Sequence, residues 1–149
     1  MVPDNLYIIG TMNTADRSLD TLDYAMRRRF AFVKFKPTVI DVEGFNEELF
    51  AMVSKLFISN YDEYCENADA ILHPSEYLAD EIQPSDVWIG HSYFLMYDEE
   101  GIDRTQLRIQ YEIIPILEEY IKGGVFKDIN EVKNVIEALI SYTDATSDN

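Results

Sequence analysis

Asn13 and Asp16 are the first residues of the chain whose types and spacing could serve chemistry, because they follow an apolar run that ends at Gly10. An Asn just past the carboxyl end of a buried parallel strand lies where open α/β sheets bind ligands. Its amide can orient a water molecule or donate to a phosphate oxygen. The same two side chains could instead form only an Asx-type turn ahead of a helix. The spacing by itself favours the turn.

Three consecutive arginines, Arg27, Arg28 and Arg29, end the segment that follows. On a helix that advances about 100° per residue, Arg28 points most nearly away from the apolar face. Arg29 falls near the edge of that face, and Arg27 lies four residues after Asp23, a spacing that suits an ion pair. A cationic last turn that complements the helix dipole, worth a few tenths to about 1 kcal/mol, explains one or two arginines but not three. The three arginines therefore can have separate roles: paired with a carboxylate, beside the core, and free to reach another molecule.

His91 is the other residue that could serve chemistry, and it stands in the aromatic stretch WIGHSYF. A lone His among aromatic residues is more often a hydrogen-bonded packing residue. Trp88, Tyr93 and Phe94 around it are expected in the core. Cys65 is the single cysteine, so the sequence has no disulfide framework and no thiolate metal site. No metal site is predicted, and a reducing cytoplasm fits best.

The charge balance limits the partners that this chain can bind directly. Its 149 residues carry 12 basic and 28 acidic side chains, a formal net charge of −16. A duplex-binding surface needs clustered Lys and Arg, and an anionic membrane repels an acidic protein, so neither is the expected contact. No apolar run approaches the ~20 residues of a membrane-spanning helix, and no signal-peptide pattern opens the chain. The 47% apolar content can supply a core.

The first 37 residues have the pattern of an α/β fold. The spacing predicts a buried strand over residues 5–10 and a helix from Asp20 to about Arg29, with an apolar face at Leu19, Leu22 and Met26. Residues 30–35 (FAFVKF) are aromatic and β-branched, which predicts a second strand closed by Pro37. A strand–helix–strand order indicates part of a parallel sheet.

After Pro37 the pattern becomes helical. Helices are predicted over residues 43–58, 75–82 and 104–122, with a solvent turn at 98–101 and residues 84–97 left unassigned. Pro115 is expected to kink or restart the third helix, and Gly123 with Gly124 to end it. Asn130 is expected to cap a last helix, and the tail from Thr143 to be frayed. The predicted domains are residues 1–37, residues 38–142 and a flexible tail over 143–149.

A resemblance to a known family rests on three stretches. The first is LYIIGTMNTADRSLDTLDYAMRRRFAF (residues 6–32), which closely resembles the AAA+ NTPase core of McrB-type proteins. These proteins are the GTP-using motor subunits of modification-dependent restriction systems. The other two, IGHSYF (Ile89–Phe94) and YEIIPILEEY (Tyr111–Tyr120), are similar to that family's lid region. The resemblance implies an α/β fold: the C-terminal part of an AAA+ αβα core, with two strands and a helix, followed by a mainly helical lid domain.

The resemblance also implies roles for the polar residues of the first stretch. Asn13 matches the sensor-1 asparagine, which senses the γ-phosphate and helps to position the attacking water. Asp16, Arg17 and Ser18 match the rest of the family's signature loop. Arg28 matches the arginine finger that reaches the nucleotide of the neighbouring subunit, and Arg29 stands beside it as a supporting arginine.

Two further residues gain a supporting role from the resemblance. Asp23 matches a helix carboxylate that orients the arginine cluster. His91 lies in the lid, and lids of this class usually contribute a polar or cationic group above the phosphates. An arginine supplied by a neighbour stabilises the charge that develops in phosphoryl transfer, an effect that reaches ~10³–10⁵ in rate in GTPases.

The implied cofactor is GTP, or ATP, with Mg²⁺ in the full-length protein, and none is expected on this chain alone. The 149 residues contain no GxxxxGKS or GxxxxGKT phosphate loop and no strand that ends in paired acidic residues, so both are expected upstream of Met1. The implied partners are further copies in a ring, an endonuclease subunit, and DNA through other domains, with no membrane contact. As a C-terminal fragment, the chain is expected to dimerise or to swap strands, because its strands would have unpaired edges.

Three other functions stay open on the sequence. The chain could be a non-catalytic interaction or oligomerisation module that docks a partner through its acidic helical part. It could bind a phosphate backbone through Arg27–Arg29, although the net charge opposes this. A guanine-reading loop of the NKxD type is disfavoured, because Thr14 replaces the Lys.

Overall fold

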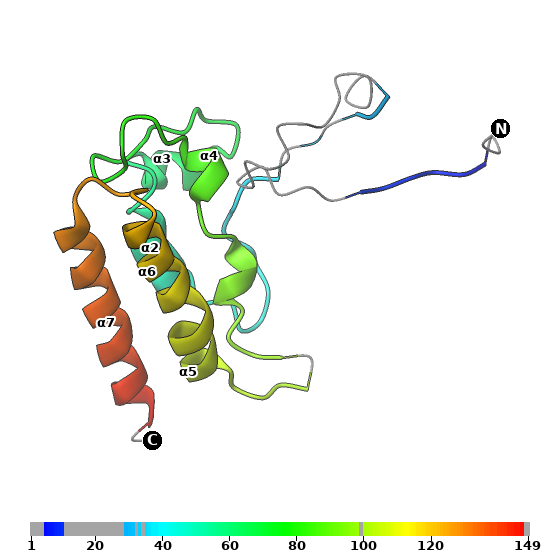
Figure 1. Cartoon of the computed structure of the whole chain (residues 1–149). Helices are drawn as coiled ribbons and strands as arrows, with labels where there is room; N and C mark the ends of the chain where they lie inside the picture. Colours follow the sequence, from blue (N-terminus) through cyan, green and yellow to red (C-terminus); the bar gives the residue numbers. More distant parts are fainter. Residues whose placement is uncertain (1–4, 11–28, 32, 34, 99, 148–149) are drawn as a thin grey trace. The chain divides into compact units, whose positions relative to one another are not determined.

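The computed structural model describes residues 5–10, 29–31, 33, 35–98 and 100–147 (Figure 1). The chain divides into two units, Met1–Lys34 and Phe35–Asn149. The second unit, called the helical unit below, contains every helix of the described residues. The division falls near Pro37, where the composition of the sequence changes.

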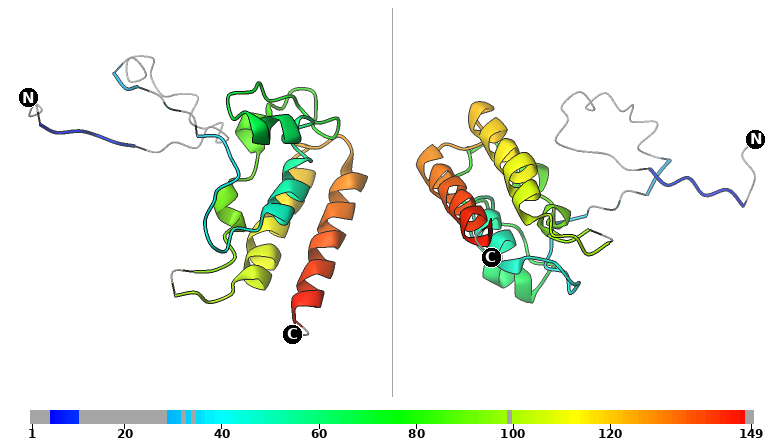
Figure 2. Two further views of the ribbon diagram at one scale, coloured as in Figure 1. Left: turned by 180° about the vertical axis from the view of Figure 1, so that it is seen from behind. Right: turned by 90° about the horizontal axis from the view of Figure 1, so that it is seen from below.

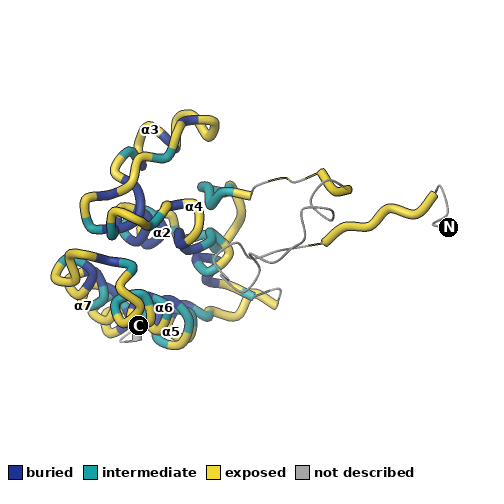
Figure 3. Tube along the Cα trace, turned by 45° about the horizontal axis from the view of Figure 1, so that its top comes forward, coloured by how far each residue is buried: buried dark blue, intermediate teal, exposed yellow. Residues whose placement is uncertain are grey.

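The predicted strand over residues 5–10 is wrong for the structure. These residues form irregular extended chain without a ladder partner, and Figure 3 shows them exposed throughout. Tyr7 and Ile9 are 87% and 93% exposed. The described part of residues 30–35 is likewise not a strand, and Phe35 is 92% exposed. A strand is held by hydrogen bonds to a neighbouring strand, and the described chain supplies none here.

Six helices build the helical unit (Figures 1 and 2). They are α2 (Glu47–Ser54), α3 (Tyr61–Glu66), α4 (Pro84–Val87), α5 (Thr105–Arg108), α6 (Ile114–Lys122) and α7 (Ile129–Ser147). A 3₁₀ turn covers His91–Phe94, and a π turn, Ile109–Ile113, joins α5 to α6. The long α7 packs beside α6 and α2.

The helix predicted over residues 43–58 is shorter in the structure and is followed by a second helix. Asn46 is the N-cap of α2, and its Oδ1 accepts the backbone N–H of Leu49 over 3.0 Å. The predicted helix over residues 75–82 is wrong: this segment consists of turns and an isolated antiparallel bridge between Leu78 and Phe126. In this segment the apolar side chains pack against the core although the backbone is irregular. Their helix-like spacing therefore does not indicate a helix.

The helix predicted over 104–122 is present from Thr105 to Lys122, and the disturbance expected at Pro115 is the π turn just before it. The N–H of Ile114 donates to Ile109, five residues earlier. The wider turn lets Pro115 follow without its ring meeting the preceding turn. The turn also changes which face is buried, because the buried residues are spaced by four: Thr105, Ile109, Ile113 and Leu117.

Glycine ends this helix as predicted. Gly124 has φ +69°, and the N–H groups of Gly124 and Val125 donate to the carbonyls of Ile121 and Tyr120. This is the Schellman pattern of hydrogen bonds. Two other predictions about the last helix are wrong. Its cap is Asp128, whose Oδ1 accepts the N–H of Asn130, and α7 continues to Ser147 with Thr143 fully buried.

An aromatic cluster forms the centre of the core. Phe50 meets Phe94 edge to face with 5.3 Å between ring centroids, and Trp88 stacks on Phe50 at 6.1 Å. Tyr64 meets Trp88 edge to face with 5.3 Å between ring centroids. The prediction of core positions is confirmed for Trp88 and Phe94, and Tyr93 is partly buried and packs against the core. These rings join α2, α3 and the 3₁₀ turn into one packed body.

Candidate functional site

Most of the sequence-predicted site lies outside the described residues. This holds for Asn13, Asp16, Arg17, Asp23 and Arg28, so the geometry of the predicted sensor loop and arginine finger is not part of the structure. Arg29 and His91 are described. The site can therefore be built from the helical unit and from Arg29 alone.

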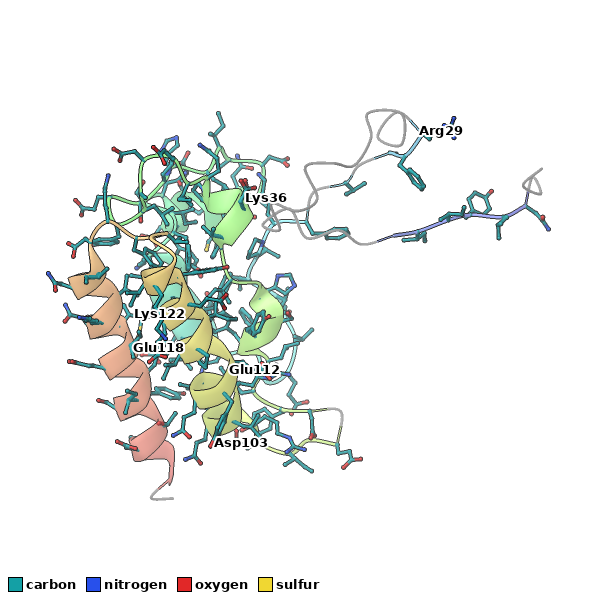
Figure 4. All side chains as sticks on the ribbon, viewed as in Figure 1. Arg29, Lys36, Asp103, Glu112, Glu118 and Lys122 are labelled. Atoms are coloured by element: carbon teal, nitrogen blue, oxygen red, sulfur yellow. The ribbon has the colours of Figure 1, made fainter. Side chains whose placement is uncertain are left out.

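Arg29 lies in a turn, and its side chain is exposed (Figure 4). The prediction that it is tucked beside a helix core is wrong for this structure. Among the described residues Arg29 has no ion-pair partner, since the three ion pairs found there involve Arg104, Arg108 and Lys127. Its guanidinium is therefore open to solvent and to other molecules.

His91 is half-buried at the start of the 3₁₀ turn and has one defined hydrogen bond. Its Nδ1 accepts the backbone N–H of Thr38 over 3.3 Å. An accepting Nδ1 places the hydrogen of the neutral imidazole on Nε2, so Nε2 is the donor of this ring. The structure thus bears out the interpretation of His91 as a hydrogen-bonded packing residue. It also leaves the Nε2–H able to donate to an oxygen ligand.

Lys36 is a residue that the sequence prediction missed. Its Nζ donates to the carbonyls of Ala68 and Ala70 at 3.5 and 3.4 Å, and lies 5.7 Å from the centre of the Tyr64 ring. Figure 4 shows Lys36 where the chain enters the helical unit. With the Thr38–His91 hydrogen bond, it fixes the first residues of the unit at two points. A single Lys beside a proline gives no sequence signal for such a role.

Burial controls the ionisation of the tyrosines in the core. It is the largest cause that raises the pKa of the Tyr61, Tyr64 and Tyr120 hydroxyls above the ordinary value. All three therefore stay protonated at neutral pH, where they cannot act as bases. For Tyr61, the neighbouring Cys65 side chain raises the pKa of the hydroxyl further.

The described residues contain no group of three or more His, Cys, Asp or Glu side chains that could hold a metal ion. Within the same part of the chain, no helix is long and apolar enough to cross a membrane.

Comparisons with known proteins assign the helical unit to a family. Residues 76–133 match the family described as McrB, alpha-helical lid domain. Over 132 residues, or 85% of this chain, the sequence is 37% identical to the Type IV methyl-directed restriction enzyme EcoKMcrB subunit of Escherichia coli (strain K12). The chain spans only 28% of the length of that relative. No solved structure matches the chain. The chain is therefore of the McrB type, and its helical unit contains the lid domain of that family.

Proposed function

We propose that this chain works as part of an NTP-hydrolysing AAA+ motor of a modification-dependent restriction complex, in which the motor drives DNA translocation and cleavage. The observation that carries the proposal is the 37% identity to a methyl-directed restriction enzyme subunit, which extends over most of the chain. In this proposal residues 1–37 belong to the motor core and residues 38–142 form the lid. The helical unit supports a lid role because it has its own packed core.

The catalytic roles fall on the residues before the lid. Asn13 senses the γ-phosphate and positions the attacking water, with Asp16 and Arg17 holding the loop around it. Arg28 reaches the nucleotide bound to a neighbouring copy, Arg29 supports it, and Asp23 orients the cluster. The exposure of Arg29 is compatible with this role, because a group that serves a neighbour must be reachable.

His91 is the lid residue assigned to the nucleotide. Its Nδ1 is occupied by the N–H of Thr38, so the Nε2–H is the group that can donate to a phosphate oxygen. A neutral donor of this kind fits a phosphate, but it cannot replace a phosphate loop. GTP or ATP with Mg²⁺ is the proposed cofactor of the full-length protein, and the lid supplies one hydrogen bond to it.

The proposed partners are further copies of the chain in a ring, an endonuclease subunit, and DNA bound by other domains, in the cytoplasm. The exposed apolar side chains of residues 5–10 favour self-association of the isolated chain, by dimerisation or strand swapping. Sedimentation velocity tests this step: wild-type chain is expected to sediment as a dimer or larger, and Ile9→Lys as a monomer. A monomeric wild-type chain would contradict it.

Substitution of Arg28 by alanine in the full-length protein tests the motor proposal. A finger supplied to a neighbour predicts a loss of turnover on the order of 10³-fold or more, with nucleotide binding retained. Arg27→Ala is the matched control, since it removes the same charge one position away and is expected to retain most of the turnover. Unchanged turnover in Arg28→Ala rules out the finger assignment.

A non-catalytic interaction module is the second candidate function. It is favoured by the charge of the helical unit, which has seven Lys and Arg residues but 24 Asp and Glu residues between positions 35 and 149. Binding of a phosphate backbone through Arg27–Arg29 is opposed by this same charge. Under the module hypothesis, Arg28→Ala leaves nucleotide turnover unchanged and loss of the acidic surface abolishes partner binding.

A further inference from the structure

A groove of about 330 Å³ lies at the end of the helical unit where residues 95–104 run out from the body and return to α5. Figure 1 shows the described parts of this hairpin extending sideways from the lower end of α5. The residues that line the groove and matter here are Gly44, Glu47, Tyr97, Asp103 and Tyr142. They come from the segment before α2, from the first residue of α2, from both arms of the hairpin and from α7.

Backbone hydrogen bonds fix the shape of this groove. The N–H of Met96 donates to the carbonyl of Gly44 over 2.8 Å, and the N–H of Arg104 donates to the carbonyl of Met96 over 2.6 Å. Asn46 adds a link to α7, because its Nδ2 donates to the Tyr142 hydroxyl over 2.9 Å. The groove is therefore present before any partner arrives, which lowers the cost of binding.

The groove contains unneutralised negative charge. Glu47 and Asp103 line it, and neither has an ion-pair partner in the described part of the chain. The two arginines that follow Asp103 in the sequence are already paired: Arg104 with Asp98 at 2.8 Å, and Arg108 with Glu112. No described cation balances these two carboxylates, so a cation supplied by a partner can do so.

Exposed apolar side chains stand next to the lining residues in the chain. They are Val42, Tyr97, Ile102 and Leu107, each between 45% and 51% exposed. Tyr97 also lines the groove, and a large exposed apolar side chain at a groove is typical of a protein-binding surface. Phosphate groups of a nucleic acid would be repelled by Glu47 and Asp103 and would not use these apolar contacts.

We propose that this groove binds a protein partner through a Lys or Arg side chain that is flanked by apolar side chains. The cation enters between Glu47 and Asp103, and the tyrosine rings of Tyr97 and Tyr142 line the path of its apolar stem. A flanking apolar group packs on Tyr97, which lines the groove and is 50% exposed. This interaction uses no nucleotide, so it stands or falls independently of the motor proposal.

An NMR titration of the ¹⁵N-labelled chain with a capped Leu-Arg-Leu-Arg-Leu peptide tests the proposal. The amide signals of Gly44, Tyr97 and Asp103 are expected to shift in a saturable way. The same peptide with citrulline in place of arginine keeps the shape but has no charge. It is expected to bind on the order of tenfold more weakly, because the charge-assisted hydrogen bonds are lost.

Three variants make the test specific to the groove. Asp103→Asn removes the charge but keeps the side-chain oxygen that accepts the N–H of Thr105, and Glu47→Gln removes the other charge. Each is expected to weaken binding of the arginine peptide about tenfold. Glu66→Gln, in α3 at the far end of the helical unit, is the control and is expected to bind normally (Figure 1).

Three results would overturn the proposal. Equal binding of the arginine and citrulline peptides would remove the role of charge. Equal losses in Glu66→Gln and Asp103→Asn would show that the peptide binds the acidic surface without preference. Shifts of the same amides on addition of a short DNA duplex, in place of the peptide, would assign the groove to nucleic acid.

Discussion

The indole Nε1–H of Trp88 donates to the hydroxyl oxygen of Ser54 over 2.9 Å, and both residues are buried. Trp88 follows α4, and Ser54 is the last residue of α2. The hydrogen bond satisfies the one polar atom of the largest side chain in the core. It therefore fixes the position of the ring on which Phe50 and Tyr64 pack.

Ser54→Ala is expected to destabilise the helical unit by about 1–3 kcal/mol, because the indole N–H would remain buried without an acceptor. Urea unfolding followed by the fluorescence of Trp88, the single tryptophan, measures this change. Ser85→Ala is the matched control on the exposed side of α4, and a change within about 0.5 kcal/mol is expected there. Equal stability of both variants would show that the Trp88–Ser54 hydrogen bond contributes nothing.

Gly44→Ala is expected to damage the groove through two separate effects. Gly44 has φ +83°, which costs a residue with a side chain about 1–2 kcal/mol. A Cβ there would also lie 2.8 Å from Cδ2 of Tyr97, so the ring would have to move. Overpacking of this kind costs a further ~1–3 kcal/mol.

Gly101→Ala separates the two effects of Gly44→Ala. Gly101 has φ +75°, but a Cβ there meets nothing within 4 Å, so only the conformational cost applies. In thermal unfolding, Gly44→Ala should therefore have a lower Tm than Gly101→Ala. Adding Tyr97→Ala to Gly44→Ala should recover the difference, and a lack of such coupling would contradict the contact.

The cap of α7 can be located by a pair of substitutions. Asp128→Ala is expected to cost about 1 kcal/mol, because the N–H of Asn130 loses its acceptor. Asn130→Ala, at the position that the sequence suggested, is expected to change stability by less than about 0.5 kcal/mol. Asp128→Asn keeps a side-chain oxygen and should stay near wild type. Chemical denaturation measures all three, and the reverse order of the two alanine variants would restore Asn130 as the cap.

Features set by local chemistry could be predicted from the sequence. Gly124 ends a helix because glycine adopts the positive φ that a Schellman turn needs. The turn at 98–101 also follows from local residues, since Gly101 donates to the carbonyl of Asp98. The predicted helical character after Pro37 is confirmed. Most of the apolar residues there are spaced with the period of a helix, which is also a local feature of the sequence.

Features set by distant partners could not be predicted. Leu107 and Tyr111 stand at helical spacing with Leu117, which predicts one shared apolar face, yet they are 46% and 72% exposed. The π turn shifts the face, and a period of 3.6 residues does not anticipate a wider turn. The roles of Ser54 and Lys36 likewise cannot be predicted from the sequence, because their hydrogen-bond partners are distant in the chain. Ser54 accepts from Trp88, and Lys36 donates to the carbonyls of Ala68 and Ala70.

The hairpin over residues 95–104 should loosen at acid pH. The backbone N–H of Ile102, at 2.9 Å, and then the Arg104 side chain lower the pKa of Asp98 below its ordinary value of 3.8. A lowered pKa means that the folded state stabilises the charged carboxylate relative to the protonated acid. The stability that ionised Asp98 gives to the hairpin is therefore complete above the ordinary aspartate pKa. It is lost as the pH falls through the lower pKa of the folded state.

Amide exchange of Ile102, followed by NMR from about pH 6 to about pH 2, measures this loosening. Protection should be constant above the ordinary aspartate pKa of ~3.9 and should fall only below it. Asp98→Asn should be less protected at neutral pH and should lack the acid transition, because it has no charge to lose. Glu100→Gln is the control, since the Glu100 side chain makes no bond within the described hairpin, and it should keep the wild-type profile. A transition centred above pH ~4 in the wild-type chain would assign the loosening to another group, because a carboxyl stabilised in its charged form titrates below its ordinary pKa.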